Sequence, residues 1–93
     1  MLRIAGKHID LLDDGDVYLQ SSFKKVDCIS GYNHCFEAKA VGIVRGNWAD
    51  NLGVPEGTSV KGTLIVCYDQ EGDPMETPWE YYDFDDDFEV VEN

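Results

Sequence analysis

Positive charge is missing from the last third of this chain: no Lys or Arg follows Lys61, whereas eleven Asp and Glu residues do. The first 61 residues are nearly neutral, with seven basic and eight acidic side chains. The chain therefore has one strongly acidic flank, residues 62–93. A negative field of this kind attracts basic proteins and repels nucleic acids and anionic membranes. We expect a basic protein partner, with no direct binding to nucleic acid or to a membrane.

Long apolar segments are also missing. No stretch approaches the roughly 20 apolar residues that span a bilayer, and the first seven residues lack the apolar run of a secretory signal. Three cysteines, Cys28, Cys35 and Cys67, form an odd set without a Cys-x-x-Cys pair, which favours reduced, partly buried thiols. A chain of 93 residues fits one domain. These features predict a single cytoplasmic domain over residues 1–93.

Short segments rich in Val, Ile, Tyr, Phe and Thr alternate with turn signals, which is typical of β structure. Asp13-Asp14-Gly15 favours a tight hairpin turn, and a second hairpin is expected at Gly31–His34. The sequence predicts a mainly β fold: a small antiparallel sheet or partly open barrel of five to six strands with one short helical turn. The predicted strands are Lys7–Leu12, Asp16–Ser21, Lys25–Ser30, Cys35–Val44, Thr58–Tyr68, and one or two strands within Trp79–Val91.

The helical turn is expected at Trp48–Leu52, with Asn47 as its N-cap and Gly53 ending it in a left-handed conformation. The following residues, Asn-Leu-Gly-Val-Pro-Glu-Gly-Thr-Ser-Val at 51–60, come directly after Trp48-Ala49-Asp50. This segment resembles the helix-to-strand corner of AbrB-type swapped-hairpin transcription factors and antitoxins. The resemblance implies a dimer with a basic, DNA-reading surface.

Aromatic and aliphatic residues are interleaved with the acids of the flank, so that this segment can fold. In an extended strand, Tyr82, Phe84, Phe88 and Val90 share one face, which Asp86 interrupts, and the acids at 83, 85, 87 and 89 share the other. Neighbouring carboxylates are then about 6.7 Å apart, within the Debye length of about 8 Å, and repel one another until a cation relieves them. A strand of DNA carries one charge per roughly 3.4 Å, so a mimic needs a second acidic row. The predicted partner-binding residues are Asp69, Glu71, Asp73, Glu76, Glu80, Asp83, Asp85, Asp87 and Glu89.

Motifs for metals and catalysis fit poorly. Asp83-x-Asp85-x-Asp87 and Asp69-x-Glu71-x-Asp73 begin like calcium loops, but Phe88 and Pro74 stand where an EF-hand requires Gly. The adjacent pair His34-Cys35 lacks the spacing of zinc ligands. The chain has neither a Gly-rich phosphate loop nor a Gly-x-Ser-x-Gly elbow. We therefore expect no metal, no cofactor and no enzyme activity.

Charge favours a non-enzymatic inhibitor that mimics nucleic acid and occupies the basic groove of a nucleic-acid-handling protein, as anti-CRISPR and anti-restriction proteins do. An immunity protein or antitoxin that neutralises a basic nuclease would need the same charge. The sequence is also compatible with a β-barrel adaptor whose acidic rim binds a peptide or a divalent ion, and with an AbrB-like regulator. The acids could also serve only solubility.

Overall fold

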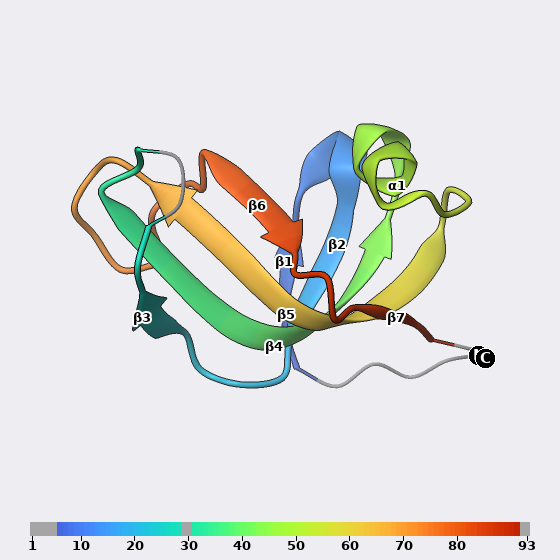
Figure 1. Cartoon of the computed structure of the whole chain (residues 1–93), viewed down its shortest axis with the longest axis horizontal. Helices are drawn as coiled ribbons and strands as arrows, with labels where there is room; N and C mark the ends of the chain where they lie inside the picture. The colour runs from blue at the N-terminus through green and yellow to red at the C-terminus, as the bar shows by residue number, and fades with distance from the viewer. Residues whose placement is uncertain (1–5, 29–30, 92–93) are drawn as a thin grey trace.

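The computed structural model describes residues 6–28 and 31–91, and in this part of the chain seven strands form one antiparallel sheet (Figure 1). The mainly β fold predicted from the sequence is confirmed. The elements are β1 (Lys7–Asp10), the 3-10 turn η1 (Leu12–Asp14), β2 (Gly15–Leu19), β3 (Lys24–Val26), β4 (His34–Val44), α1 (Gly46–Leu52), β5 (Thr58–Tyr68), β6 (Tyr81–Phe84) and β7 (Glu89–Val90).

Two long strands, β4 and β5, form the centre of the sheet and pair along their whole length, from His34↔Tyr68 to Val44↔Thr58. On the outer side of β4, β2 pairs with its second half and β3 with its first half. On the outer side of β5, β7 pairs with its first half and β6 with its second half. β1 adds to the outer edge of β2. The seven strands thus fill five positions across the sheet, because both strands beside the central pair are interrupted.

The core lies on the concave face of the bent sheet. Alternate residues of β4 and β5 point into it, including the buried Ala40, Val44, Val60 and Leu64. Helix α1 covers this face with Trp48, and the Trp48 ring stacks on Phe84 of β6 with centroids 5.3 Å apart and planes 8° apart. This stack joins the helix to the acidic flank.

The first turn differs from its prediction. The tight turn expected at Asp14-Gly15 is instead the 3-10 turn η1, in which Leu12 has a φ of 57°. The Asp10 carboxylate accepts a hydrogen bond from the Leu12 backbone N–H at 2.8 Å, and the Arg45 N–H donates to the Asp14 carbonyl at 2.9 Å. These contacts fix η1 against the start of α1.

The helix begins earlier than predicted. Arg45, not Asn47, precedes its first residue, Gly46, and makes no side-chain capping hydrogen bond. The predicted end is confirmed, because Gly53 is left-handed with a φ of 74° and its N–H bonds back to the last turn. The third strand is shorter than the predicted Lys25–Ser30, whose residues 29 and 30 lie outside the described residues.

The sheet bends toward closure without completing it. The Tyr82 hydroxyl of β6 donates a hydrogen bond to the Asp14 carboxylate of η1, so the two ends of the sheet approach each other. β6 nevertheless pairs only with β5, and β1 only with β2, among the described residues. The fold is therefore a partly open barrel with a seam between β1 and β6. No helix within the described ranges has the length and apolar character needed to cross a bilayer.

Candidate partner-binding surface

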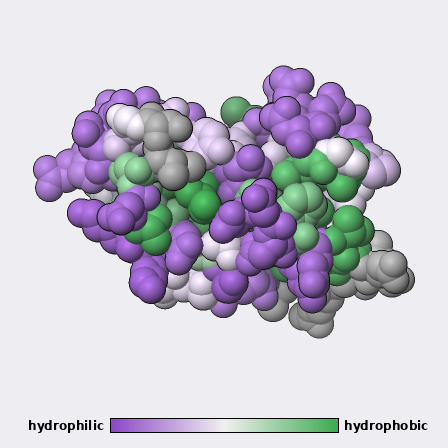
Figure 2. All heavy atoms as spheres, in the orientation of Figure 1, coloured by the Kyte–Doolittle hydropathy of each residue, from purple (hydrophilic) through white to green (hydrophobic). Residues whose placement is uncertain are grey.

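The nine predicted acids fall into two groups along the chain. One group lies in the loop between β5 and β6, at 69, 71, 73, 76 and 80, and every member is exposed. The other lies on β6, on β7 and in the turn between them, at 83, 85, 87 and 89. All of this second group are exposed except Asp83, which is half-buried. Figure 2 shows that hydrophilic residues cover most of one face of the molecule, with hydrophobic residues visible between them.

The regular row of acids predicted for residues 83–89 is wrong. β6 ends at Phe84, and Asp85–Asp87 form a turn whose Asp85 N–H donates to the Thr63 carbonyl at 2.8 Å. The pairing register shifts by two residues, from Leu64↔Phe84 to Lys61↔Glu89. The cause is local packing: a Cβ at Gly62 would lie 2.9 Å from the Phe88 Cα, so the turn passes directly over this glycine.

Three acids of the second group already have partners. Asp83 accepts a hydrogen bond from Trp48 Nε1 at 3.2 Å. Asp87 lies 3.9 Å from Lys39 Nζ and accepts a hydrogen bond from the Thr63 hydroxyl, and Glu89 lies 3.7 Å from Lys61 Nζ. Exposed ion pairs of this kind stabilise by at most about 1 kcal/mol. They nevertheless offset part of the negative field where β7 crosses the near-neutral body.

The other flank acids have no cationic partner: no Lys, Arg or His in the described ranges lies within ion-pair distance of them. We call this set the unpaired acids: Asp69, Glu71, Asp73, Glu76, Glu80, Asp85 and Asp86. Several of them order the backbone instead. Glu80 accepts a hydrogen bond from the Asp69 N–H at 2.6 Å, and Asp73 accepts one from the Met75 N–H at 2.8 Å. The loop therefore holds its carboxylates on a defined surface.

A pocket of about 300 Å³ lies where α1, η1 and β6 meet, and we call it the acidic pocket. Its carboxylates are Asp14, Glu80 and Asp83, and Trp48 and Tyr82 contribute aromatic surface. Burial, together with the hydrogen bond to Asp14, raises the pKa of Tyr82 well above its usual range. Tyr82 therefore remains a donor that orients the Asp14 carboxylate. Carboxylates beside aromatic faces suit an ammonium or guanidinium group.

The sequence predicts only part of this pocket. Glu80 and Asp83 belong to the predicted binding surface, whereas local sequence signals place Asp14 in a turn and Trp48 in the core. Asp14 and Tyr82 are 68 positions apart. Their contact depends on the bend of the sheet, which leaves no local signal in the sequence.

Within the described ranges, no group of three His, Cys, Asp or Glu side chains is placed to hold a metal ion. The three cysteines are thiols; Cys35 and Cys67 are buried opposite each other on β4 and β5, and Cys28 is exposed.

Comparison of the chain with protein families, with curated proteins and with solved structures finds no match in any of the three. The likeness to AbrB-type proteins thus stays confined to the short corner after α1.

Proposed function

We propose that this protein is a non-enzymatic, acidic inhibitor that occupies the cationic groove of a nucleic-acid-handling protein, in the manner of anti-CRISPR and anti-restriction proteins. The observation that carries the proposal is the set of seven unpaired acids, which lie within eighteen residues and have no cationic neighbour among the described residues. An immunity protein or antitoxin that covers a basic nuclease would use the same surface.

The physical case rests on unrelieved repulsion. Carboxylates closer than the Debye length of about 8 Å repel one another at physiological salt. Among the unpaired acids, Asp85 and Asp86 are adjacent in the chain, so their repulsion raises the free energy of the isolated protein, and a basic partner would lower it again when it binds. The same field speeds association with cationic surfaces and slows association with nucleic acid.

The acidic pocket supports a specific anchor for such a partner. Its carboxylates are fixed by donors of the fold, Trp48 for Asp83 and Tyr82 for Asp14. A Lys or Arg side chain of the partner would enter between them without disturbing the fold. Arginine is favoured, because its planar guanidinium both stacks on aromatic rings and binds carboxylates through two parallel hydrogen bonds.

The test compares two variants of equal charge. One replaces four unpaired acids by amides (Asp69→Asn, Glu71→Gln, Asp85→Asn and Asp86→Asn). The control replaces four acids of the near-neutral body (Asp27→Asn, Glu37→Gln, Asp50→Asn and Glu56→Gln). Each set changes the formal net charge from −12 to −8. Both variants and the parent are used for affinity capture from a host lysate at low salt, and bound proteins are released by a salt gradient.

We expect the parent and the control to retain a basic nucleic-acid-binding protein that elutes only at raised salt, and the first variant to lose it at lower salt. Nucleic acid added to the purified complex should compete with the inhibitor. If both variants lose the partner equally, total charge explains the binding and the proposed surface is wrong. If the captured protein binds nucleic acid and inhibitor at the same time, the mimicry is wrong.

A further inference from the structure

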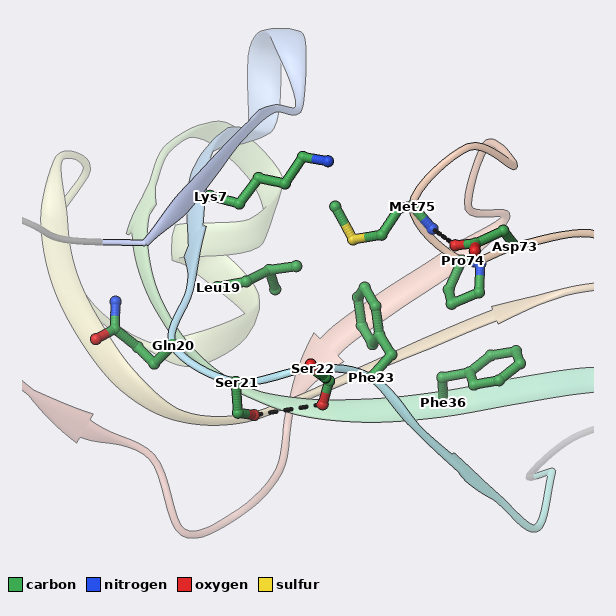
Figure 3. Close-up of a pocket in the computed structure, with 10 residues that line it drawn as sticks. All are labelled: Lys7, Leu19, Gln20, Ser21, Ser22, Phe23, Phe36, Asp73, Pro74 and Met75. Carbon is green, nitrogen blue, oxygen red and sulfur yellow. Dashed lines mark hydrogen bonds between the residues drawn. The ribbon is translucent and has the colours of Figure 1, made fainter.

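A groove follows the open seam of the barrel, between β1 and the loop residues 73–79. It consists of two adjoining hollows of about 590 and 360 Å³, which share Pro74 and Met75. Figure 3 shows the Lys7 and Met75 side chains extending toward each other over the first hollow, with Leu19 and Phe23 below them. Ile9, Trp79 and Tyr82 line the second hollow. We call the two hollows together the seam groove.

One wall of the seam groove is a strand edge without a partner strand among the described residues. The Leu11 N–H donates to the Gly15 carbonyl, so the odd-numbered residues of this hairpin exchange the hydrogen bonds between β1 and β2. In an antiparallel pair the alternate residues turn their N–H and C=O groups the other way. The backbone groups of His8 and Asp10 therefore point outward, toward the open edge of β1.

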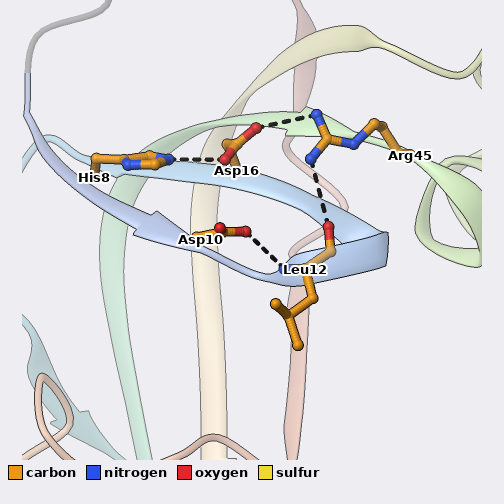
Figure 4. A network of polar contacts seen from close by, with 5 residues as sticks. All are labelled: His8, Asp10, Leu12, Asp16 and Arg45. Atoms are coloured by element: carbon orange, nitrogen blue, oxygen red, sulfur yellow. Dashed lines mark hydrogen bonds and ion pairs between the residues drawn. The ribbon is translucent and has the colours of Figure 1, made fainter.

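This edge is held in place by polar contacts (Figure 4). His8 Nε2 lies 2.8 Å from one Asp16 oxygen, and Arg45 Nη1 donates to the other at 3.1 Å. The hydrogen bond with His8 and the Arg45 guanidinium hold the pKa of Asp16 below its usual range. Arg45 also donates to the Leu12 carbonyl at 3.4 Å. The β1–β2 hairpin is thus fixed to the central strand β4, and its outer edge is preformed.

We propose that the seam groove binds an extended segment of a basic partner, which adds to the edge of β1 as a further strand. The segment would alternate apolar and basic residues. Successive side chains of a strand point to opposite faces, so those beside Ile9 enter the apolar groove and those beside Asp10 reach the rim. Strand addition of this kind gains affinity from backbone hydrogen bonds and specificity from alternate side chains. This inference rests on the proposed basic partner and names the part of it that docks.

Charge selects this occupant over a second copy of the chain. Three acidic residues, Asp10, Asp73 and Glu76, and one basic residue, Lys7, line the seam groove. Two copies of a protein with net charge −12 would bring like charges together at this rim. A basic strand would neutralise them and would also cover the apolar side chains of Ile9 and Met75.

The test uses a defined probe, the peptide acetyl-Lys-Val-Lys-Val-Lys-Val-Lys-amide. Its control, acetyl-Lys-Lys-Val-Val-Val-Lys-Lys-amide, has the same composition and charge without the alternation. Two protein variants separate backbone from side chain. His8→Pro removes the outward N–H, and a proline is tolerated at such an edge position. His8→Ala keeps that N–H, and both variants lose the contact with Asp16. Binding is measured by calorimetry, folding by the thermal midpoint, and edge pairing by hydrogen exchange.

We expect the alternating peptide to bind the parent and to slow amide exchange at His8 and Asp10. Both His8 variants lose the contact with Asp16 that holds the edge, so they are compared with each other: His8→Pro should bind about five- to tenfold more weakly than His8→Ala, the effect of one backbone hydrogen bond. Equal binding by His8→Pro and His8→Ala would overturn the inference, as would equal binding of the two peptides. Concentration-dependent dimers with protected β1 amides would show that a second copy occupies the edge, which also overturns it.

The two proposals fail separately. None of the four acids changed in the capture experiment lines the seam groove. If the peptide fails while charge-dependent capture persists, the partner docks on the acids without strand addition. If the peptide binds, but replacing the four unpaired acids leaves the captured partner unchanged, only the proposed inhibitor surface is wrong.

Discussion

Gly42 lies under the aromatic stack that joins α1 to β6, and a methyl group there has no free space. A Cβ at this position would lie 2.8 Å from Phe84 Cε2, 3.0 Å from Phe84 Cζ and 3.5 Å from Trp48 Cη2. Phe84 is 5% exposed and Trp48 4% exposed, so neither ring can move aside without losing its packing. Gly42→Ala and Phe84→Ala should therefore be strongly coupled.

The expected energies follow from this contact. Gly42→Ala overpacks a buried site, which costs about 1 to 3 kcal/mol. Phe84→Ala removes a buried ring, which costs about 3 to 5 kcal/mol. In the double variant the new methyl group enters the space left by the ring, and alanine is better than glycine within a strand by about 0.5 to 1 kcal/mol. Gly42→Ala should thus destabilise the parent and slightly stabilise the Phe84→Ala protein, with a coupling of about 1.5 to 4 kcal/mol.

Urea unfolding of the parent, the two single variants and the double variant, followed by circular dichroism, measures this coupling. The total stability of a chain of 93 residues is about 5 to 14 kcal/mol, and over most of this range the Phe84→Ala variant still folds. Phe23→Ala is the matched control, because Phe23 packs against Phe36 and Trp79 and not over Gly42. If Gly42→Ala costs the same in the parent and in the Phe84→Ala protein, the ring does not lie over Gly42 and the stack described above is wrong.

Two further predictions concern titration. Burial and the hydrogen bond to Asp14 raise the pKa of Tyr82, so its contribution to stability is complete below the unfolded pKa of about 10 and is lost as pH rises toward the folded value. The free energy of unfolding should fall above pH 10, and that of the Tyr82→Phe variant should fall less steeply; equal slopes in urea titrations would contradict this. The hydrogen bond with Cys35 raises the pKa of the exposed Cys28 thiol to about 11. Iodoacetamide should therefore label Cys28 slowly at pH 8 and faster at higher pH, with Cys35 and Cys67 protected. Mass spectrometry counts the labels, and early labelling of Cys35 or Cys67 would show that these two thiols are not buried.

Local signals predict the centre of the fold well. The run of β-branched residues in β5 predicts the observed strand Thr58–Tyr68, because such residues suit a buried pleated surface whatever lies beside it. Gly53 ends α1 as predicted, since its left-handed conformation depends only on the neighbouring turn. Strand β4 begins one residue before the predicted Cys35 and ends as predicted at Val44.

Contacts between distant segments produce the differences. Residues 82–90 alternate as in a strand except at Asp86, yet Gly62 on β5 lets the Phe88 backbone pass over it and the chain turns there. Asp14 enters the acidic pocket because the sheet bends until Tyr82 reaches η1. Residues adjacent in sequence indicate neither that Gly62 lies opposite Phe88 nor that the sheet bends.

The position of each acid in the sheet indicates which acids are available for a partner. Glu89 lies on β7 and Asp87 in the turn before it, at the outer edge of the sheet, where charged side chains prevent pairing with another sheet, and both face lysines of the body. An acidic sheet edge is thus explained by solubility alone. The loop between β5 and β6 has no such need, because it presents no strand edge, yet it carries five of the seven unpaired acids and borders both the acidic pocket and the seam groove. Charge there fits the proposed cationic partner, which would reach this end of the barrel.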